Sequence, residues 1–224
     1  MTYLYLIRHA ENIANLTKEF SSFKIDYNLT PKGVLQAHQT AEALTGRRIE
    51  AVYASPLRRT RETAQAITTR LGVPLTVMED FREVHVGALE GRRDLEGWRI
   101  HNDVIADWHA GHPHSRFPEG ENYLELFSRL RAGLRKVASL HPNGRAAVVG
   151  HGGMFSFCLP DLCDNMERSL PYEITCGNAS ITEIEVWLED GQPKAHLVRW
   201  SQVSHLRGEA ALLVNGWPEE ASKS

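Results

Sequence analysis

The sequence has few cysteines and no long apolar segment. Its 224 residues include only Cys158, Cys163 and Cys176, and none of them forms a CxxC pair, which indicates ordinary thiols in a reducing compartment. No apolar run approaches the roughly 20 residues that cross a bilayer, and the N-terminus lacks a basic region followed by an apolar core and a cleavage site. These absences predict a soluble, cytoplasmic protein with no membrane partner.

An excess of charge of one sign is also missing. Lys and Arg number 25 and Asp and Glu 28, which gives a formal net charge of -3. This balance provides no global footprint for nucleic acid, so any anion specificity must come from a local cluster. With 42% hydrophobic residues the chain is long enough for one sizeable core, and we expect a single domain over residues 1–224.

Two common catalytic motifs are absent as well. No P-loop is present, which removes nucleotide hydrolysis by that route. No G-x-S-x-G elbow is present either, so the Gly-His-Gly-Gly run at residues 150–153 is not supported as the oxyanion loop of an α/β-hydrolase.

Strand-like runs alternate with helical ones along the chain. The expected strands are Tyr3–Ile7, Ala51–Ala54, Leu75–Met78 and Ala146–Val149, and the expected helices are 30–44, 55–71 and 121–140. Thr30-Pro31 and Ser55-Pro56 each have the form of an N-cap followed by proline in the first helical turn. This alternation predicts an α/β fold with three layers, in which helices cover both faces of a mostly parallel central sheet.

The C-terminal part follows a different pattern. Residues 180–187 alternate between apolar and polar types, and Asp190-Gly191 then forms a turn signal before residues 196–200. A β-hairpin at an edge of the sheet is the expected structure. The residues after Trp217 are expected to fray.

Polar clusters follow each of the four expected parallel strands. They are Arg8-His9, the stretch 55–64 (SPLRRTRETA), the stretch 81–91 (FREVHVGALEG) and the stretch 150–154 (GHGGM). Because ligands of open parallel sheets bind beyond the carboxyl ends of the strands, these clusters should converge.

The converged groups suit a phosphate dianion. Arg8 and Arg58 are permanent cationic forks, and Asn15 and the backbone at Gly152 add neutral donors. Arg59 and Arg61, on the same helix as Arg58, are expected on a solvated face.

Two histidines and a carboxyl group could supply the chemistry. A neutral nitrogen of His9 or His151 can attack phosphorus in line and form a phosphohistidine that water later hydrolyses. Glu83 is the available acid for the leaving oxygen. No metal or other cofactor is expected, since the arginines would repel a cation.

An insert at about residues 92–120 separates the third and fourth strands. It could act as a lid, and Trp98, Trp108 and Phe117 are candidates to face the non-phosphate end of a substrate. Its four histidines invite a metal site, but no carboxylate or cysteine completes a ligand set, and we expect a polar loop around Gly111 and Pro113; these histidines are His101, His109, His112 and His114.

Taken in order, eight short motifs resemble the histidine phosphatase superfamily, the branch that contains phosphoglycerate mutases and small phosphatases. The motifs are LIRHAEN, LTPKG, SPLRRTRETA, REVHVGALEG, PEGEN, VVGHGGM, GNASITEIE and SHL, between Tyr3 and Leu206. The resemblance implies a phosphoglycerate mutase-like fold with His9 as the phosphorylated nucleophile and Glu83 as the proton donor. It places around the phosphate Arg8, Arg58, His151 and Asn15.

Departures from the family pattern define further candidates. Asn122 stands where the family often has a serine near the site, and Ser21 lies where small phosphatases commonly show Gln-Gly; both are substrate-binding candidates. Ala10 replaces the usual glycine after the nucleophile, which is tolerable unless that backbone needs a positive φ. Glu83 is followed by Val-His-Val-Gly instead of the Arg-His-Tyr-Gly of the mutases, which argues against mutase activity and leaves the role of His85 open.

The sequence therefore predicts a metal-independent phosphatase whose partner is a small phosphorylated metabolite. The alternatives are a phosphoglycerate mutase, a phosphatase of phosphorylated proteins and a non-catalytic phosphate-binding module. Retention of both histidines and Glu83 speaks against the last one, since a binder needs no proton donor. The oligomeric state is left open.

Overall fold

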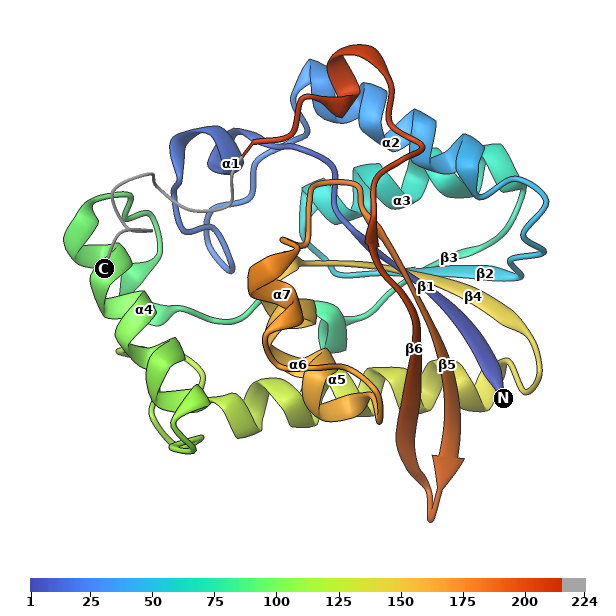
Figure 1. The fold of residues 1–224 in the computed structure, drawn as a ribbon. Coiled ribbons are helices and arrows are strands. Elements are labelled where there is room, and N and C mark those ends of the chain that lie inside the picture. The colour runs from blue at the N-terminus through green and yellow to red at the C-terminus, as the bar shows by residue number, and fades with distance from the viewer. Residues whose placement is uncertain (215–224) are drawn as a thin grey trace.

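The structure, a computed structural model, describes residues 1–214 and is built on one six-stranded sheet (Figure 1). Its strands lie in the order β3-β2-β4-β1-β5-β6. The four strands from β3 to β1 are parallel, whereas β5 pairs antiparallel with β1 and β6 antiparallel with β5. The bounds are β1 Thr2–Arg8, β2 Ala51–Ala54, β3 Leu75–Val77, β4 Arg145–Gly150, β5 Ile181–Glu189 and β6 Gln192–Gln202.

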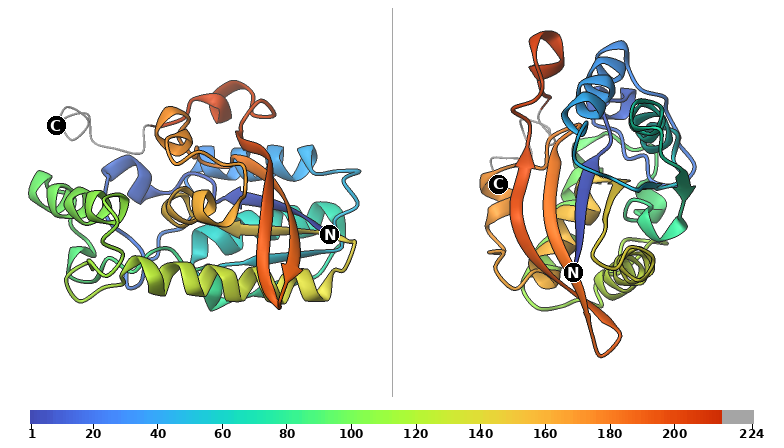
Figure 2. Two further views of the ribbon diagram at one scale, coloured as in Figure 1. Left: turned by 60° about the horizontal axis from the view of Figure 1, so that its bottom comes forward. Right: turned by 90° about the vertical axis from the view of Figure 1, so that its right-hand side faces the viewer.

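Helices cover both faces of this sheet, which confirms the predicted three layers (Figures 1 and 2). One face packs against α2 (Pro31–Ala43) and α3 (Arg58–Leu71), and the other against α5 (Tyr123–Leu140) and α6 (Gly152–Leu162). The strand period of two explains the division: Leu4 and Leu6 join the core on the α5 side, while Tyr5 and Ile7 join the core on the α2 side.

Three helices lie away from these layers. They are α1 (Ile13–Thr17), α4 (Leu95–His109) and α7 (Leu170–Glu173), and the short 3₁₀ turns are η1 (Glu79–Phe81), η2 (Gly87–Leu89) and η3 (Gly208–Ala211). Both α1 and α4 lie at the end of the molecule where the parallel strands finish (Figures 1 and 2). They therefore flank the edge at which the sequence places the site.

The residues around Gly111 and Pro113 form a loop, as expected, but the part of the insert before them is helix α4, which was not predicted. Asp94 caps it by accepting a hydrogen bond from the N–H of Gly97. Trp98, Ile105 and Trp108 lie on one buried face at helical spacing. The apolar period was present in the sequence, but the polar and histidine-rich residues between these positions hid it.

Of the two expected helix N-caps, Thr30 is confirmed and Ser55 is not. Thr30 caps α2 through its side chain, as predicted. Ser55 does not cap α3, which begins at Arg58 after Leu57, with no side-chain cap. The hydroxyl of Ser55 instead lies 2.8 Å from Nε2 of His151, so it is engaged there and does not cap the helix.

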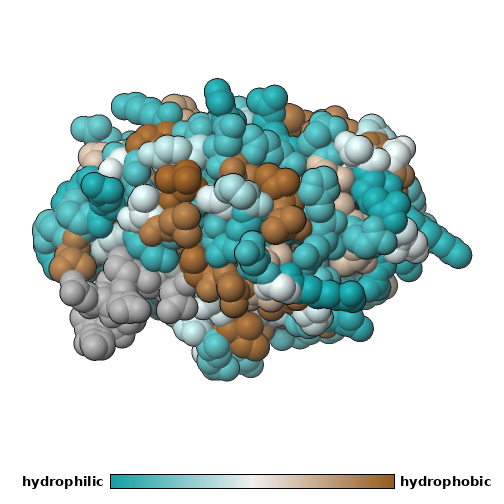
Figure 3. Space-filling model, turned by 90° about the horizontal axis from the view of Figure 1, so that it is seen from above, coloured by the Kyte–Doolittle hydropathy of each residue, from teal (hydrophilic) through white to brown (hydrophobic). Residues whose placement is uncertain are grey.

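Further expectations concern the C-terminal hairpin and tail, the cysteines and membrane-spanning segments. The β5–β6 hairpin is confirmed at one edge of the sheet, and the tail expected to fray lies outside the described residues. All three cysteines are free and buried. Within residues 1–214, no helix has the length and apolar character needed to span a membrane. Seen from above, apolar side chains are scattered among hydrophilic ones (Figure 3).

Candidate active site

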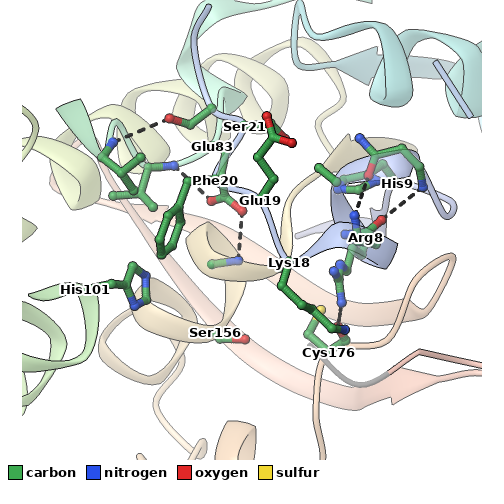
Figure 4. Close-up of a pocket in the computed structure, with 18 of the residues that line it drawn as sticks. Arg8, His9, Lys18, Glu19, Phe20, Ser21, Glu83, His101, Ser156 and Cys176 are labelled. Carbon is green, nitrogen blue, oxygen red and sulfur yellow. Dashed lines mark hydrogen bonds between the residues drawn. The ribbon is translucent and has the colours of Figure 1, made fainter. Parts of the chain in front are cut away.

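A pocket of about 190 Å³ opens at the carboxyl ends of the parallel strands, as the sequence predicts. Figure 4 shows the side chains around it. The predicted site residues that line it are Arg8, His9, Asn15, Ser21, Glu83 and Gly152. His151 is buried and is not among the lining residues; it lies behind His9, with 5.3 Å between the ring centroids.

The ring of His9 is held in one tautomer. Its Nδ1 lies 2.8 Å from the carbonyl oxygen of Ala10, which can only accept, so Nδ1 carries the hydrogen. Its Nε2 accepts a hydrogen bond from Nε of Arg59 at 3.1 Å. Burial, followed by the charges of Arg59 and Arg8, lowers the pKa of His9 well below its ordinary value. His9 is therefore a neutral imidazole whose Nε2 lone pair faces an arginine.

The arginine that donates to His9 is Arg59 and not Arg58. Arg59 is 3% exposed, which contradicts the prediction that it lies on a solvated face of the helix. Besides His9, Arg59 donates from Nη2 to the carbonyl of Ser21 at 2.7 Å and to Nδ1 of His151 at 3.2 Å. Burial lowers the pKa of Arg59 to about 10.

Arg58 points away from the pocket. Its side chain is 61% exposed and pairs loosely with Asp26, and its Nη1 donates to Asn28. Because a helix turns by about 100° per residue, only one of two successive arginines can face the site. The structure therefore contradicts the predicted position of Arg58 in the site, and Arg59 is the arginine of this helix that lines the pocket.

Two arginine donors are buried without a partner in the described part of the chain. They are Nε of Arg8 and Nη1 of Arg59. Arg8 is otherwise held by a hydrogen bond from Nη1 to the carbonyl of Cys176. Unpaired buried donors are costly, and both residues line the pocket. The arrangement fits an anion with several oxygens.

The ring of His151 is held by two hydrogen bonds behind the pocket, one with Arg59 and one with Ser55. Its Nδ1 accepts from Arg59, so its Nε2 donates to the hydroxyl of Ser55. Burial, then the charges of Arg59 and His9, lowers the pKa of His151 well below its ordinary value. Two neutral imidazoles therefore share one arginine.

Glu83 sits at the N-terminus of α6. Its carboxylate accepts hydrogen bonds from the N–H groups of Gly153 at 3.0 Å, Met154 at 2.8 Å and Val84 at 2.9 Å. A Cβ at Gly153 would lie 2.9 Å from Oε1 of Glu83, and one at Gly152 would lie 3.0 Å from Nε of Arg8. The two glycines allow a cation and a carboxylate to approach the same helix end.

Comparisons with known proteins identify the family of this chain. The model of the histidine phosphatase superfamily (branch 1) matches residues 4–201. The chain belongs to this superfamily. It is 32% identical over 207 residues to a putative phosphoserine phosphatase 2 of Hydrogenobacter thermophilus, covering 92% of this chain and 98% of that protein.

Two further relatives extend the comparison of this histidine phosphatase. A probable phosphoglycerate mutase of Erwinia tasmaniensis is 32% identical over 204 residues, covering 85% of this chain and 90% of that protein. A solved structure of a mutant phosphoserine phosphatase from Entamoeba histolytica, in complex with phosphoserine, has 27% identity and a TM-score of 0.74, with 92% of this chain and all of that one covered. The fold is that of the phosphoglycerate mutase-like phosphatases.

The neutral amide donors of this histidine phosphatase are only partly as predicted. Asn15 lines the pocket, caps α1 together with Asn12 and accepts from Asn178 at 3.0 Å. Asn12, which also lines the pocket, has a buried Nδ2 without a partner in residues 1–214, a donor that sequence reasoning missed. Asn122 is not among the lining residues; it caps α5 in a capping box with Glu125.

The remaining predictions concern the insert and Ala10. Trp98 and His101 line the pocket, whereas Phe117 is in the core. Burial lowers the pKa of His101 to about 4. Ala10 is not among the residues with a positive φ, so its Cβ is tolerated. The ring of His85 packs on Phe23 at 4.9 Å, outside the pocket lining.

Metal ligands do not gather in the part of the chain described. Within residues 1–214, no group of three or more His, Cys, Asp or Glu side chains is arranged to hold a metal ion. His109, the last residue of α4, contacts the hydroxyl of Tyr172 in α7, and His112 lies 4.0 Å from Asp107. The donors at the pocket are arginines and amides, which suit an anion.

Proposed function

We propose that this histidine phosphatase hydrolyses small phosphate monoesters through a phosphohistidine at His9. The observation that carries the proposal is the neutral Nε2 of His9 beside two buried arginine donors without partners, Nε of Arg8 and Nη1 of Arg59. An anion that takes these donors would have its phosphorus next to the nucleophile.

In the first step, Nε2 of His9 leaves its hydrogen bond with Nε of Arg59 and attacks phosphorus in line. The P–N bond forms while the ester P–O bond breaks, and Glu83, which enters this step protonated, gives its proton to the leaving oxygen. The charges of Arg8 and Arg59 stabilise the equatorial oxygens as negative charge spreads over them. The products of this half-reaction are the free alcohol and phosphorylated His9.

In the second step, water attacks the phosphohistidine. Glu83 takes a proton from this water, the P–N bond breaks, and inorganic phosphate and neutral His9 are released. Asn15, Asn12 and the N–H of Gly152 are the further phosphate contacts that we propose. Ser21 and His151, the latter a predicted phosphate contact, instead act by holding Arg59, through the Ser21 carbonyl and Nδ1 of His151. No metal ion enters either step.

The substrate is a small phosphorylated metabolite. Besides the arginines, the lining of the pocket includes the apolar side chains of Phe20, Trp98 and Phe157 and the charged side chains of Lys18 and Glu19. A leaving group of a few carbon atoms with polar substituents fits this lining better than a protein chain does, because α4 flanks the opening. The relatives that bind phosphoserine and 3-phosphoglyceric acid support this size class.

The proton donor can be tested by making it unnecessary. Glu83→Gln should slow phosphorylation of His9 by an alkyl phosphate by about 10²-fold or more, because general acid catalysis contributes that much. A nitrophenyl phosphate should lose much less, since its phenolate leaves without a proton. Burst kinetics measure the phosphorylation step separately from the hydrolysis of phosphohistidine.

Glu19→Gln is the matched control for that experiment. It changes another carboxylate of the same pocket and should alter both substrates by the same factor. Equal losses for the two substrates in Glu83→Gln would mean that Glu83 only shapes the pocket, and the acid role would be refuted.

A phosphoglycerate mutase is the second candidate. The 32% identity to a probable phosphoglycerate mutase favours it, whereas Val84 and His85 after the acid argue against it. Incubation with 3-phosphoglycerate separates the two: a mutase forms 2-phosphoglycerate, whereas a phosphatase releases glycerate and phosphate.

A further inference from the structure

Glu90 is surrounded by the backbone of the loop 21–25, and Ser21 and Ser22 of this loop line the pocket. Its Oε1 accepts hydrogen bonds at 3.0 Å from each of four successive N–H groups, those of Ser22, Phe23, Lys24 and Ile25. Its Oε2 accepts from the hydroxyl of Ser22 at 2.8 Å. Successive N–H groups that converge in this way form a nest for an anion, and here a side chain of the same protein occupies it.

The charge of Glu90 matters for this contact. Burial raises the pKa of Glu90, but the hydrogen bonds from Ile25, Phe23 and Ser22 outweigh burial and hold the pKa below its ordinary value. The residues of the loop belong to no helix or strand that could satisfy their N–H groups. The ionised carboxylate therefore replaces secondary structure in fixing the loop.

The same loop touches the phosphate site through Ser21. The carbonyl of Ser21 accepts from Nη2 of Arg59 at 2.7 Å, and Nε of Arg59 donates to Nε2 of His9 at 3.1 Å. Ser21 directly precedes the four N–H groups that hold Glu90, so the position of its carbonyl depends on the shape of the nest. Phe20, Ser21 and Ser22 also line the pocket.

We propose that Glu90 is a positioning residue that sets Arg59 for phosphate binding through the loop 21–25. The inference rests on the proposed function, because it assigns Arg59 to the phosphate. Glu90 does not line the pocket and touches neither His9 nor the phosphate. Its removal should nevertheless weaken phosphate binding, since Arg59 would lose the carbonyl that orients its guanidinium.

Inorganic phosphate provides a probe that needs no turnover. Calorimetric titration should show that Glu90→Ala binds phosphate at least about tenfold more weakly than wild type, and kcat/KM should fall by about 10²-fold, as a misplacement of about 1 Å can cause. Acetate at about 0.1 M should restore activity and phosphate binding in the variant by filling the empty nest. In wild type, where Glu90 fills the nest, acetate can only compete with phosphate.

Glu125→Ala is the matched control. The carboxylate of Glu125 also accepts a backbone N–H, that of Asn122 at 3.1 Å, but at the start of α5 and outside the pocket lining. Both variants should lower the melting temperature, whereas only Glu90→Ala should lose phosphate affinity and respond to acetate.

The outcomes separate this inference from the proposed function. Unchanged phosphate affinity in folded Glu90→Ala, or a deficit that acetate leaves as it is, would overturn the role of Glu90. A wild-type protein that binds no phosphate would instead overturn the proposed function. If Glu90→Ala does not fold, Glu90→Gln decides: its neutral amide should weaken phosphate binding severalfold, and wild-type affinity in this variant would refute the inference.

Discussion

The buried charge of Arg59 should make the free protein less stable than it could be. Burial lowers its pKa from 12.5 to about 10, and each pKa unit corresponds to about 1.4 kcal/mol, so the charged form is disfavoured by about 3 kcal/mol. Arg59→Met removes this charge and keeps most of the apolar volume. Two of the three hydrogen-bond partners of Arg59, His9 and Ser21, line the pocket and can bind water there, which offsets most of the loss. We expect the free energy of unfolding to stay constant or to rise by up to about 3 kcal/mol.

The same substitution should remove most of the activity. A hydrogen bond from a charged group contributes about 1.5–3 kcal/mol, so two bonds from Arg59 to phosphate give about 3–6 kcal/mol. At about 1.4 kcal/mol per factor of ten, kcat/KM should fall by about 10²–10⁴-fold. Arg58→Met is the matched control, since an exposed ion pair contributes at most about 1 kcal/mol; its kcat/KM should stay within about threefold of wild type.

Urea unfolding and kinetics with nitrophenyl phosphate measure both quantities. Strong loss of activity in Arg58→Met together with a normal rate in Arg59→Met would refute the assignment of Arg59 to the phosphate. A fall of more than about 1 kcal/mol in the stability of Arg59→Met would refute the reasoning from buried charge.

Three further predictions follow from the site. His9→Ala should fold and lose turnover, and an acid-labile, base-stable phosphoenzyme should form in wild type only; wild-type turnover in the variant would contradict the mechanism. Chelators should leave the rate unchanged while vanadate inhibits, and a loss in chelator that a divalent ion reverses would require a metal site. Because His101 has its pKa lowered from 6.5 to about 4 by burial, the unfolded chain binds a proton that the folded one does not, so stability falls as the pH drops from about 6.5 toward 4. Between pH 7 and pH 5 the loss from this group is about 2 kcal/mol, and urea unfolding of His101→Phe should show a correspondingly weaker pH dependence; an unchanged dependence would rule His101 out as its source.

The fold could be predicted from local patterns because the apolar runs correspond to strands and the segments with helical periodicity correspond to helices. Apolar runs of four to six residues between helical segments give parallel strands, and the rule that sites lie beyond their carboxyl ends placed Arg8, His9 and Glu83 in one pocket. Neither step requires the exact start of any helix. Errors of one or two residues at the ends of elements therefore did not matter for these side chains.

Arg58 and Arg59 show where such errors do matter. The Ser55-Pro56 pair predicted a helix that begins too early, whereas α3 begins at Arg58. The start of a helix fixes which side chains face inward, and neighbouring positions differ by about 100°. Thr63 and Ile67 follow Arg59 at intervals of four residues and are buried with it, so the period of the helix is a local signal that separates Arg59 from Arg58. The contact of Ser55 with His151 joins residues 96 positions apart in the chain and leaves no such signal.

Helix α6 explains how groups of opposite charge can share the pocket. Its N-terminus carries free N–H groups and a partial positive charge, which suit the acceptor oxygens of Glu83 better than the guanidinium of Arg8. Gly153 and Met154 give their N–H groups to Glu83, while Arg8 is held by the carbonyl of Cys176. At Gly152 and Gly153 a side chain would press on one of these two groups. The motif Gly-His-Gly-Gly therefore has a physical reason beyond its histidine, because the glycines let an acid and a cation line the same pocket without pairing with each other.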